Sequence, residues 1–295
     1  MNRSRYIVIL FIGLIAVSFG AIFAKVIDAT PFVIAAWRLT IASAIYYGVM
    51  RVRSGALRTA LTRSQWIIAL ISGLFLAIHF TTWFISLKHT TVASSVLLVD
   101  TAPIFVALGG YLILKEKPTL LMIVGMGIAL TGVVLISSLD FASEQSTLFG
   151  NLMAICGAIG AAGYILAGRR LRAEMSTLHY VTAVYSVCAV MLLVTVIVIG
   201  DPLFGHDVRN YLYLFGIALI PQTIGHTTLN WSLKYFSATT ISVLLLGEPI
   251  VATLLAWILL GERIGGMNVA GGLMIIAGLA IVLRGEMKRG KSEQK

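Results

Sequence analysis

Charged residues are scarce in this sequence. Only 12% of the 295 residues are Asp, Glu, Lys or Arg, whereas a soluble domain carries about 25%. Hydrophobic residues make up 59% of the chain, and the mean hydropathy is +0.96. So few charges cannot cover a water-facing surface, and the composition therefore excludes an ordinary soluble protein.

Cysteine is nearly absent as well. The two cysteines, Cys156 and Cys188, both lie inside apolar runs. This pattern predicts two buried thiols and no disulfide framework. The histidines and acids likewise have no compact zinc-binding spacing, so we expect neither a metal site nor a cofactor.

The net charge of +10 does not indicate a nucleic-acid-binding protein. Such a protein places its basic residues on one face, interleaved with aromatic residues. Here the basic residues instead occupy the connections between apolar runs. Their expected partners are the anionic headgroups of membrane lipids.

Long apolar runs are what the sequence has in abundance. A membrane-spanning helix needs about 20 predominantly apolar residues, and alternating strand patterns are missing. The N-terminal run is long for a signal peptide and has no clear cleavage site, so we expect it to be retained as the first helix. Ten candidate helices cover residues 6–27, 31–50, 65–87, 91–114, 119–137, 147–168, 177–199, 210–233, 237–260 and 265–284.

The orientation follows from the basic residues, which are enriched on the cytoplasmic side of membrane proteins. With the N-terminus inside, seventeen of the 22 lysines and arginines lie in cytoplasmic segments. The sequence therefore predicts an all-α, multi-pass inner-membrane protein with both termini in the cytoplasm.

An internal repeat organises these helices. An offset of 146 residues maps Ser86-Leu87-Lys88 onto Ser232-Leu233-Lys234, and Pro103-Ile104 onto Pro249-Ile250. We interpret residues 1–140 and 141–295 as two five-helix repeats. Because five is odd, the second repeat must enter the membrane from the opposite side. Inverted repeats are typical of secondary transporters, whose equivalent halves can open alternately to each side.

Similar motifs mark the fourth and ninth helices, with Pro103 and Glu116 in one and Gly247-Glu248-Pro249 and Gly261-Glu262 in the other. Arg38 lies early in the second helix. Together with the five-plus-five helices, these residues make the whole chain resemble the EamA-like branch of the drug/metabolite transporter superfamily. The resemblance implies a central cavity and secondary transport, mostly export, of amino acids, metabolites or drugs.

Two acids within the apolar runs are candidates for proton coupling. Asp100 and Glu248 lie near the middle of the fourth and ninth helices, where a charge costs about 2.5–3.5 kcal/mol. Either could carry a coupling proton or recognise a substrate amine, or be a neutral hydrogen-bonded carboxyl. Pro103 and Pro249 predict kinks that would act as hinges or be tolerated in packing. Glu116 and Glu262, at helix ends, are expected to be solvated.

Polar side chains mark one face of the eighth helix. Gln222, His226 and Asn230 follow one another at spacings of four, as do His79 and Trp83 in the third helix. These five residues are candidates for substrate binding; interhelical hydrogen bonding is the alternative. Arg38 could reach the interface, pair with an acid or bind a carboxylate.

No nucleotide-hydrolysing motif accompanies this pattern. Gly285 to Ser292 fits the string G-x-x-x-x-G-K-S, but a working P-loop joins a strand to a helix. Uphill transport would therefore use an ion gradient. The sequence predicts a transporter, and not an enzyme, that exports a small polar or amphipathic metabolite such as an amino acid, with protons as the candidate coupling ion. The alternatives are a facilitator, an importer, a lipid-headgroup flippase and an intramembrane enzyme.

Overall fold

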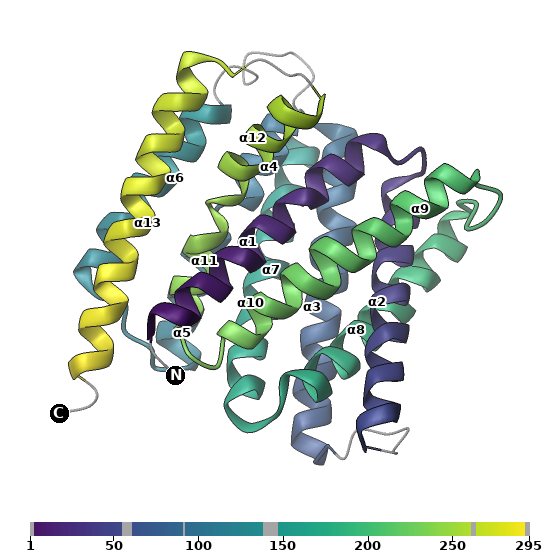
Figure 1. The fold of residues 1–295 in the computed structure, drawn as a ribbon, viewed down its shortest axis with the longest axis horizontal. Coiled ribbons are helices and arrows are strands. Elements are labelled where there is room, and N and C mark those ends of the chain that lie inside the picture. The colour runs from purple at the N-terminus through teal and green to yellow at the C-terminus, as the bar shows by residue number, and fades with distance from the viewer. Residues whose placement is uncertain (1–2, 55–60, 91, 138–146, 261–263, 293–295) are drawn as a thin grey trace. The chain divides into compact units, whose positions relative to one another are not determined.

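A computed structural model describes residues 3–54, 61–90, 92–137, 147–260 and 264–292 of the chain. Within these ranges all regular structure is helical, as Figure 1 shows. Glu262 and the predicted boundary between residues 140 and 141 lie outside the described residues. The helices are α1 (Arg3–Val26), α2 (Pro31–Ser54), α3 (Arg63–His89), α4 (Val92–Val99), α5 (Ala102–Ile113), α6 (Leu120–Ser137), α7 (Leu148–Glu174), α8 (Thr177–Ile199), α9 (Val208–Ile217), the π-helix η2 (Ala218–His226), α10 (Thr227–Ser232), α11 (Ala238–Leu245), α12 (Glu248–Leu260) and α13 (Gly266–Ser292).

Several of these helices are long and apolar enough to cross a membrane, and two further spans arise where α4 is followed by α5 and α11 by α12. In the described part of the chain eight spans meet this criterion, and Leu120–Ile136 is a shorter apolar helix. The predicted segment 210–233 is built from α9, η2 and α10 in direct succession. The total of ten crossings and the cytoplasmic termini stay predictions.

Many large apolar side chains point outward. Val52 is 87% exposed, Val198 80% and Leu120 76%. Exposing these side chains to water would be unfavourable, because burying each CH₂ group stabilises a protein by about 0.8 kcal/mol. Contact with hydrocarbon carries no such cost, and the exposed apolar residues therefore fit a lipid environment.

The helix boundaries repeat along the chain. Helices α4 and α11 begin at Val92 and Ala238 and end at Val99 and Leu245, which is the sequence offset of 146 at both ends. Helix α13 likewise begins 146 residues after α6. The same local structure thus occurs twice, including a break after α4 and after α11.

These breaks differ from the predicted kinks. Instead of bending a continuous helix, Pro103 lies in the first turn of α5, and Pro249 is the second residue of α12. Proline is tolerated there because the first amides of a helix have no intrahelical partner. Asp100 therefore lies in the turn before α5, and Glu248 is the first residue of α12.

The chain forms two compact units, and each takes segments from both halves of the sequence. Unit 1 comprises Met1–Thr81 and Ala167–Lys234, and unit 2 comprises Thr82–Leu166 and Tyr235–Lys295. In unit 1, α2 packs on α8, and α1 packs on η2 (Figure 1).

In unit 2, α6 and α13 lie side by side over most of their length (Figure 1). A Cβ atom added to Gly125 would lie 2.6 Å from the carbonyl oxygen of Gly278, and one added to Gly132 would lie 2.5 Å from that of Gly271. The offset of 146 pairs Gly125 with Gly271 and Gly132 with Gly278. Each glycine therefore contacts the counterpart of the other, which is the reciprocal pattern of a twofold axis. The two helices run antiparallel, as inverted repeats require.

Candidate functional site

A buried hydrogen bond joins α2 to the π-helix η2 in unit 1. The Nε atom of Arg38 donates to Oε1 of Gln222 over 2.6 Å. Arg38 is 7% exposed and Gln222 is 0% exposed. A charged side chain is almost never buried without a specific partner, so this pair marks a polar site within apolar helices.

The local sequence explains why the helix carrying Gln222 is irregular. Pro221 lies inside η2 and supplies no amide hydrogen, so an α-helical ladder cannot continue through it. The hydroxyl of Thr223 instead donates to the carbonyl of Ala218, five residues earlier, over 2.8 Å. Single π-helical turns are frequent at functional sites. The wider turn also means that residues four apart no longer align as the α-helical stripe predicted.

Aromatic and histidine side chains surround this arginine. Its guanidinium carbon lies 5.1 Å from the centre of the Phe80 ring, a distance suited to a cation–π interaction. The His79 ring lies 5.0 Å from the same phenyl ring. His226 interacts electrostatically with both Arg38 and His79. The structure thus brings His79, Gln222 and His226 together around Arg38.

Asn230, the third residue of the predicted polar stripe, lies in α10, and its contacts differ from those of Gln222 and His226. It is 2% exposed, and its Nδ2 atom donates to the Tyr185 hydroxyl over 3.0 Å. That hydroxyl also lies 3.3 Å from Oγ1 of Thr227. Nearby, the hydroxyl of Tyr46 donates to the carbonyl of Thr223 over 2.7 Å. These contacts tie α8 to α10 and α2 to η2.

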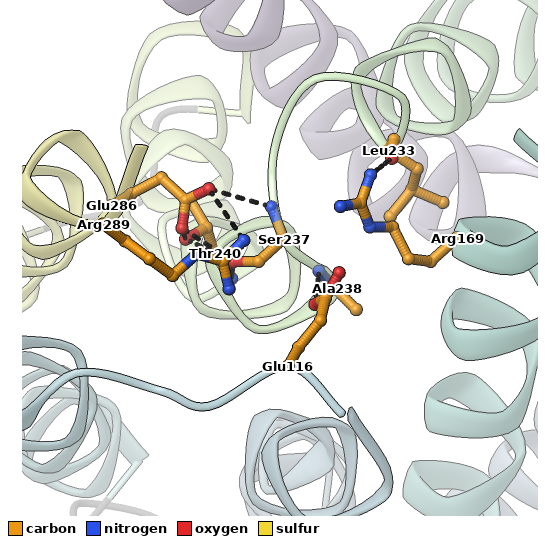
Figure 2. A network of polar contacts seen from close by, with 8 residues as sticks. All are labelled: Glu116, Arg169, Leu233, Ser237, Ala238, Thr240, Glu286 and Arg289. Carbon is orange, nitrogen blue, oxygen red and sulfur yellow. Dashed lines mark hydrogen bonds and ion pairs between the residues drawn. The ribbon is translucent and has the colours of Figure 1, made fainter. Parts of the chain in front are cut away.

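Two arginines at the end of α7 bind the end of α10. Nη1 of Arg169 donates to the carbonyl of Leu233 over 2.6 Å (Figure 2). Nε of the buried Arg172 donates to the carbonyl of Asn230 over 3.2 Å. The last carbonyls of a helix have no intrahelical donor, and cations are favoured there. Sequence reasoning counted these arginines only as topology signals.

The two membrane-embedded acids lie in unit 2, at the helix breaks. Asp100 and Glu248 interact electrostatically. They are not equivalent positions of the repeat, because Asp100 lies in the turn before α5 and Glu248 is the first residue of α12. Within the described structure, the buried Oδ2 atom of Asp100 has no hydrogen-bond partner. Glu248 lies at the start of α12, where the positive end of the helix dipole stabilises a carboxylate.

Trp83 belongs to unit 2 as well. Its ring stacks on that of Phe84 at a centroid distance of 5.1 Å, and a Cβ atom added to Gly157 would contact it. The predicted residues are therefore divided between the units. His79, Gln222, His226 and Asn230 lie in unit 1, whereas Trp83, Asp100, Glu248, Pro103 and Pro249 lie in unit 2.

A carboxylate clamp, formed by Glu286 and Glu116, holds the N-terminus of α11 (Figure 2). Glu286 is 4% exposed and accepts from the Ser237 amide over 3.1 Å and from the Ser237 and Thr240 hydroxyls, each over 2.8 Å. Oε2 of Glu116 accepts from the Ala238 amide over 3.1 Å. Glu116 is partly exposed, and in addition to the expected solvation it supplies an acceptor for the first amides of α11. The Ser-x-x-Thr start of α11 was the available signal.

Among the described residues, no group of three His, Cys, Asp or Glu side chains could hold a metal ion. The string from Gly285 to Ser292 continues α13 as a helix, so it does not form a phosphate-binding loop. Apolar helices, matched breaks and buried polar clusters together define a polytopic membrane protein built from a repeated unit.

Comparisons with known proteins agree with that class. The profile of the EamA-like transporter family matches residues 4–138 and again residues 148–284. The chain belongs to this family, which consists of membrane transporters and not of enzymes. The double match also supports a two-repeat fold.

Several relatives carry the same general description. An uncharacterized transporter of Clostridium kluyveri is 29% identical over 66% of this chain and 65% of its own length, just under two thirds. The uncharacterized transporter YyaM of Bacillus subtilis is 24% identical over 83% of this chain and 82% of its own. A crystal structure with 22% identity gives a TM-score of 0.81 and covers 95% of this chain and 98% of that one; it shows the fold alone.

Proposed function

We propose that the protein is a secondary transporter that exports a small polar or amphipathic metabolite, such as an amino acid, by alternating access. The observation that carries the proposal is the polar cluster of the buried Arg38 and Gln222 with the partly buried His226. Ionisable groups inside membrane helices are costly, and they mark substrate or ion pathways.

The repeated helix breaks supply the moving parts. Residues at helix ends can absorb large changes in backbone angles, whereas packed helices move as rigid bodies. The breaks after α4 and α11 recur at equivalent positions, with Pro103 and Pro249 as hinges. Motion at these two equivalent breaks would supply the alternation that an alternating-access cycle requires.

The energy source in this proposal is an ion gradient, with protons as the first candidate. Asp100 and Glu248 lie at the breaks, so a change in backbone angle would also change the environment of each carboxyl. A carboxyl that takes up a proton on one side of the membrane and releases it on the other couples the proton flux to the substrate flux.

The cell location in this proposal is the plasma membrane, in which the bacterial relatives would also reside.

Counterflow in proteoliposomes tests the proposal. Vesicles loaded with one unlabelled amino acid or related metabolite at a time should take up the labelled compound faster than protein-free vesicles. The His226→Ala protein should exchange more slowly at an unchanged membrane level, and the Glu174→Gln protein, altered at an exposed residue, should match the wild type. A panel without any exchanged compound would contradict metabolite transport. Equal exchange without accumulation under any gradient would identify a facilitator.

A further inference from the structure

We infer that Glu116 and Glu286 position the helix break that carries Glu248, and that they act on proton coupling through it. The inference rests on the proposed function, because it adds two positioning residues to the same coupling step. The contacts of α11, the packing of α5 beside it and a strained turn at Lys115 support it separately.

Helix α11 is a short link between the carboxylate clamp and the break. It contains eight residues, Ala238–Leu245, and is about 12 Å long at a rise of 1.5 Å per residue. Only Leu246 and Gly247 separate it from Glu248. The first seven residues of α11 are buried, and a close-packed helix moves as a rigid body instead of deforming. A displacement of the clamped end is therefore transmitted to the break.

The clamp joins α11 to a tightly packed part of unit 2. Glu286 belongs to α13, which packs on α6 with closely approaching backbones. Its carboxylate accepts from the Ser237 amide and from the Ser237 and Thr240 hydroxyls (Figure 2). Glu116 follows α5 and accepts from the Ala238 amide. Two carboxylates from different elements thus fix one end of α11.

Helix α5 connects the same clamp to the other coupling acid. It begins at Ala102, two residues after Asp100, and ends three residues before Glu116. It packs on α11, where a Cβ atom added to Gly110 would lie 3.9 Å from Oγ1 of Thr239. The two helices therefore form a packed pair, in which the chain leads from the clamp to a break along each helix.

The turn that presents Glu116 is strained. Lys115 has a φ of 59°, a left-handed conformation that is unfavourable for a residue with a side chain. The offset of 146 places Gly261 at the equivalent position of the second repeat. The Glu116 amide closes the turn by donating to the Gly110 carbonyl over 2.9 Å, a helix end that usually contains glycine. Such strain persists only where the surrounding structure fixes it, and it collects at functional sites.

Few other ionisable groups lie in the described helices around the break. Asp100 interacts electrostatically with Glu248. Helices α4, α6 and α11 contain no ionisable residue, and α12 contains none besides Glu248. Helix α12 packs on α13, whose ionisable residues begin at Arg284, at the end that carries Glu286. The others in the described helices of unit 2 are Lys88, His89, Tyr111, Cys156 and Tyr164.

The pH dependence of exchange tests the inference. Exchange of a transported metabolite at equal concentrations is measured in vesicles across a range of pH. Glu116→Gln weakens the bond to the Ala238 amide, and Thr240→Val removes a single donor to Glu286 while keeping the shape of the side chain. Both variants should shift the half-maximal pH in the same direction by roughly half a pH unit, a three-fold change in proton affinity. Because Thr240→Val is mild, the test does not depend on the folding of Glu116→Gln.

The same variants in a Glu248→Gln background show whether the clamp acts through Glu248. Neither variant should then move the remaining pH profile. A role in stability alone would lower the midpoint of thermal unfolding and leave the pH profile unchanged in both backgrounds. Glu174→Gln, altered at an exposed acid of unit 1, is the charge-matched control and should have the wild-type profile.

Three results would overturn the inference. Wild-type pH profiles in both clamp variants would reduce the clamp to a structural contact and leave metabolite transport standing. Shifts that differ in direction, or that persist in the Glu248→Gln background, would assign the pH response to other groups. An absence of exchange across the whole panel would overturn the proposed function together with the inference, whereas wild-type exchange that does not vary with pH would overturn the coupling step and the inference alone.

Discussion

At the scale of single residues, Glu286 contributes most visibly to the described fold. Its carboxylate accepts three hydrogen bonds from Ser237 and Thr240 and lies 3.6 Å from a guanidinium nitrogen of Arg289. A buried carboxylate with this many donors is stabilising only while the donors remain. The start of α11, and hence the break that precedes Glu248, depends on this clamp.

The variant Glu286→Gln should therefore destabilise the protein. It keeps the size of the side chain but replaces charge-assisted bonds by neutral ones and turns one acceptor into a donor facing Ser237. The expected loss is about 1.5–3 kcal/mol, measured as a lower midpoint of thermal unfolding in detergent. Glu174→Gln, which breaks an exposed ion pair worth about 0–1 kcal/mol, is the control. Equal midpoints for both variants would mean that the clamp does not hold α11.

At the scale of elements, the pairing of α6 with α13 sets the tightest packing requirement. A Cβ atom on Gly278 would lie 2.5 Å from the Gly125 carbonyl oxygen and 2.7 Å from the Ala129 amide nitrogen. Both are backbone atoms, so the helices would have to separate. Close backbone approach through small residues is the usual way in which membrane helices associate.

We expect Gly278→Ala to destabilise unit 2 by about 1–3 kcal/mol, as overpacking does elsewhere. Gly127→Ala is the matched control, because a Cβ atom there meets nothing within 4 Å. The control should be neutral or slightly stabilising, since alanine favours the helix over glycine. Thermal unfolding of the two purified variants measures the difference, and a Gly278→Ala protein as stable as the control would contradict the close α6–α13 contact.

Much of the element pattern could be predicted from the sequence, because apolar runs and prolines determine helices locally. Pro103 and Pro249 marked the two irregular regions, but the sequence predicted kinks in continuous helices, and the structure has breaks before the prolines instead. The π-helix was not predictable, since Pro221 in an apolar run fits a simple kink equally well. Arg38 and Gln222 are 184 residues apart, and Glu286 resembles an ordinary charge of a basic tail. Contacts at such separations are set by tertiary packing, which no local pattern contains.

At the scale of the whole molecule, the charge distribution predicts a definite topology. Reporter fusions ending at Ser176, between α7 and α8, and at Lys295 should both report the cytoplasm. A fusion ending at Gly205, between α8 and α9, should report the opposite side, because basic residues are enriched in cytoplasmic connections. A cytoplasmic signal at Gly205, or a periplasmic signal at either other site, would contradict ten crossings with cytoplasmic termini.

The proposed mechanism also requires that both units act in one cycle. Unit 1 holds the candidate substrate site around Arg38, whereas unit 2 holds Asp100 and Glu248. Coupling then means that protonation in one unit changes the access of substrate to the other. Variants in the two units should accordingly give different defects. Variants in unit 1 should slow substrate exchange, whereas variants in unit 2 should reduce substrate accumulation.

Transport driven only by a pH difference, compared between the wild type and Glu248→Gln, tests this account most directly. The glutamine keeps the shape of the side chain but cannot carry a proton. The account predicts that wild-type vesicles accumulate the exchanged metabolite above its external concentration. Glu248→Gln vesicles should fail to accumulate it yet still exchange it at equal concentrations. Wild-type vesicles that never accumulate substrate, or Glu248→Gln vesicles that accumulate it as well as the wild type, would contradict proton-coupled transport through Glu248.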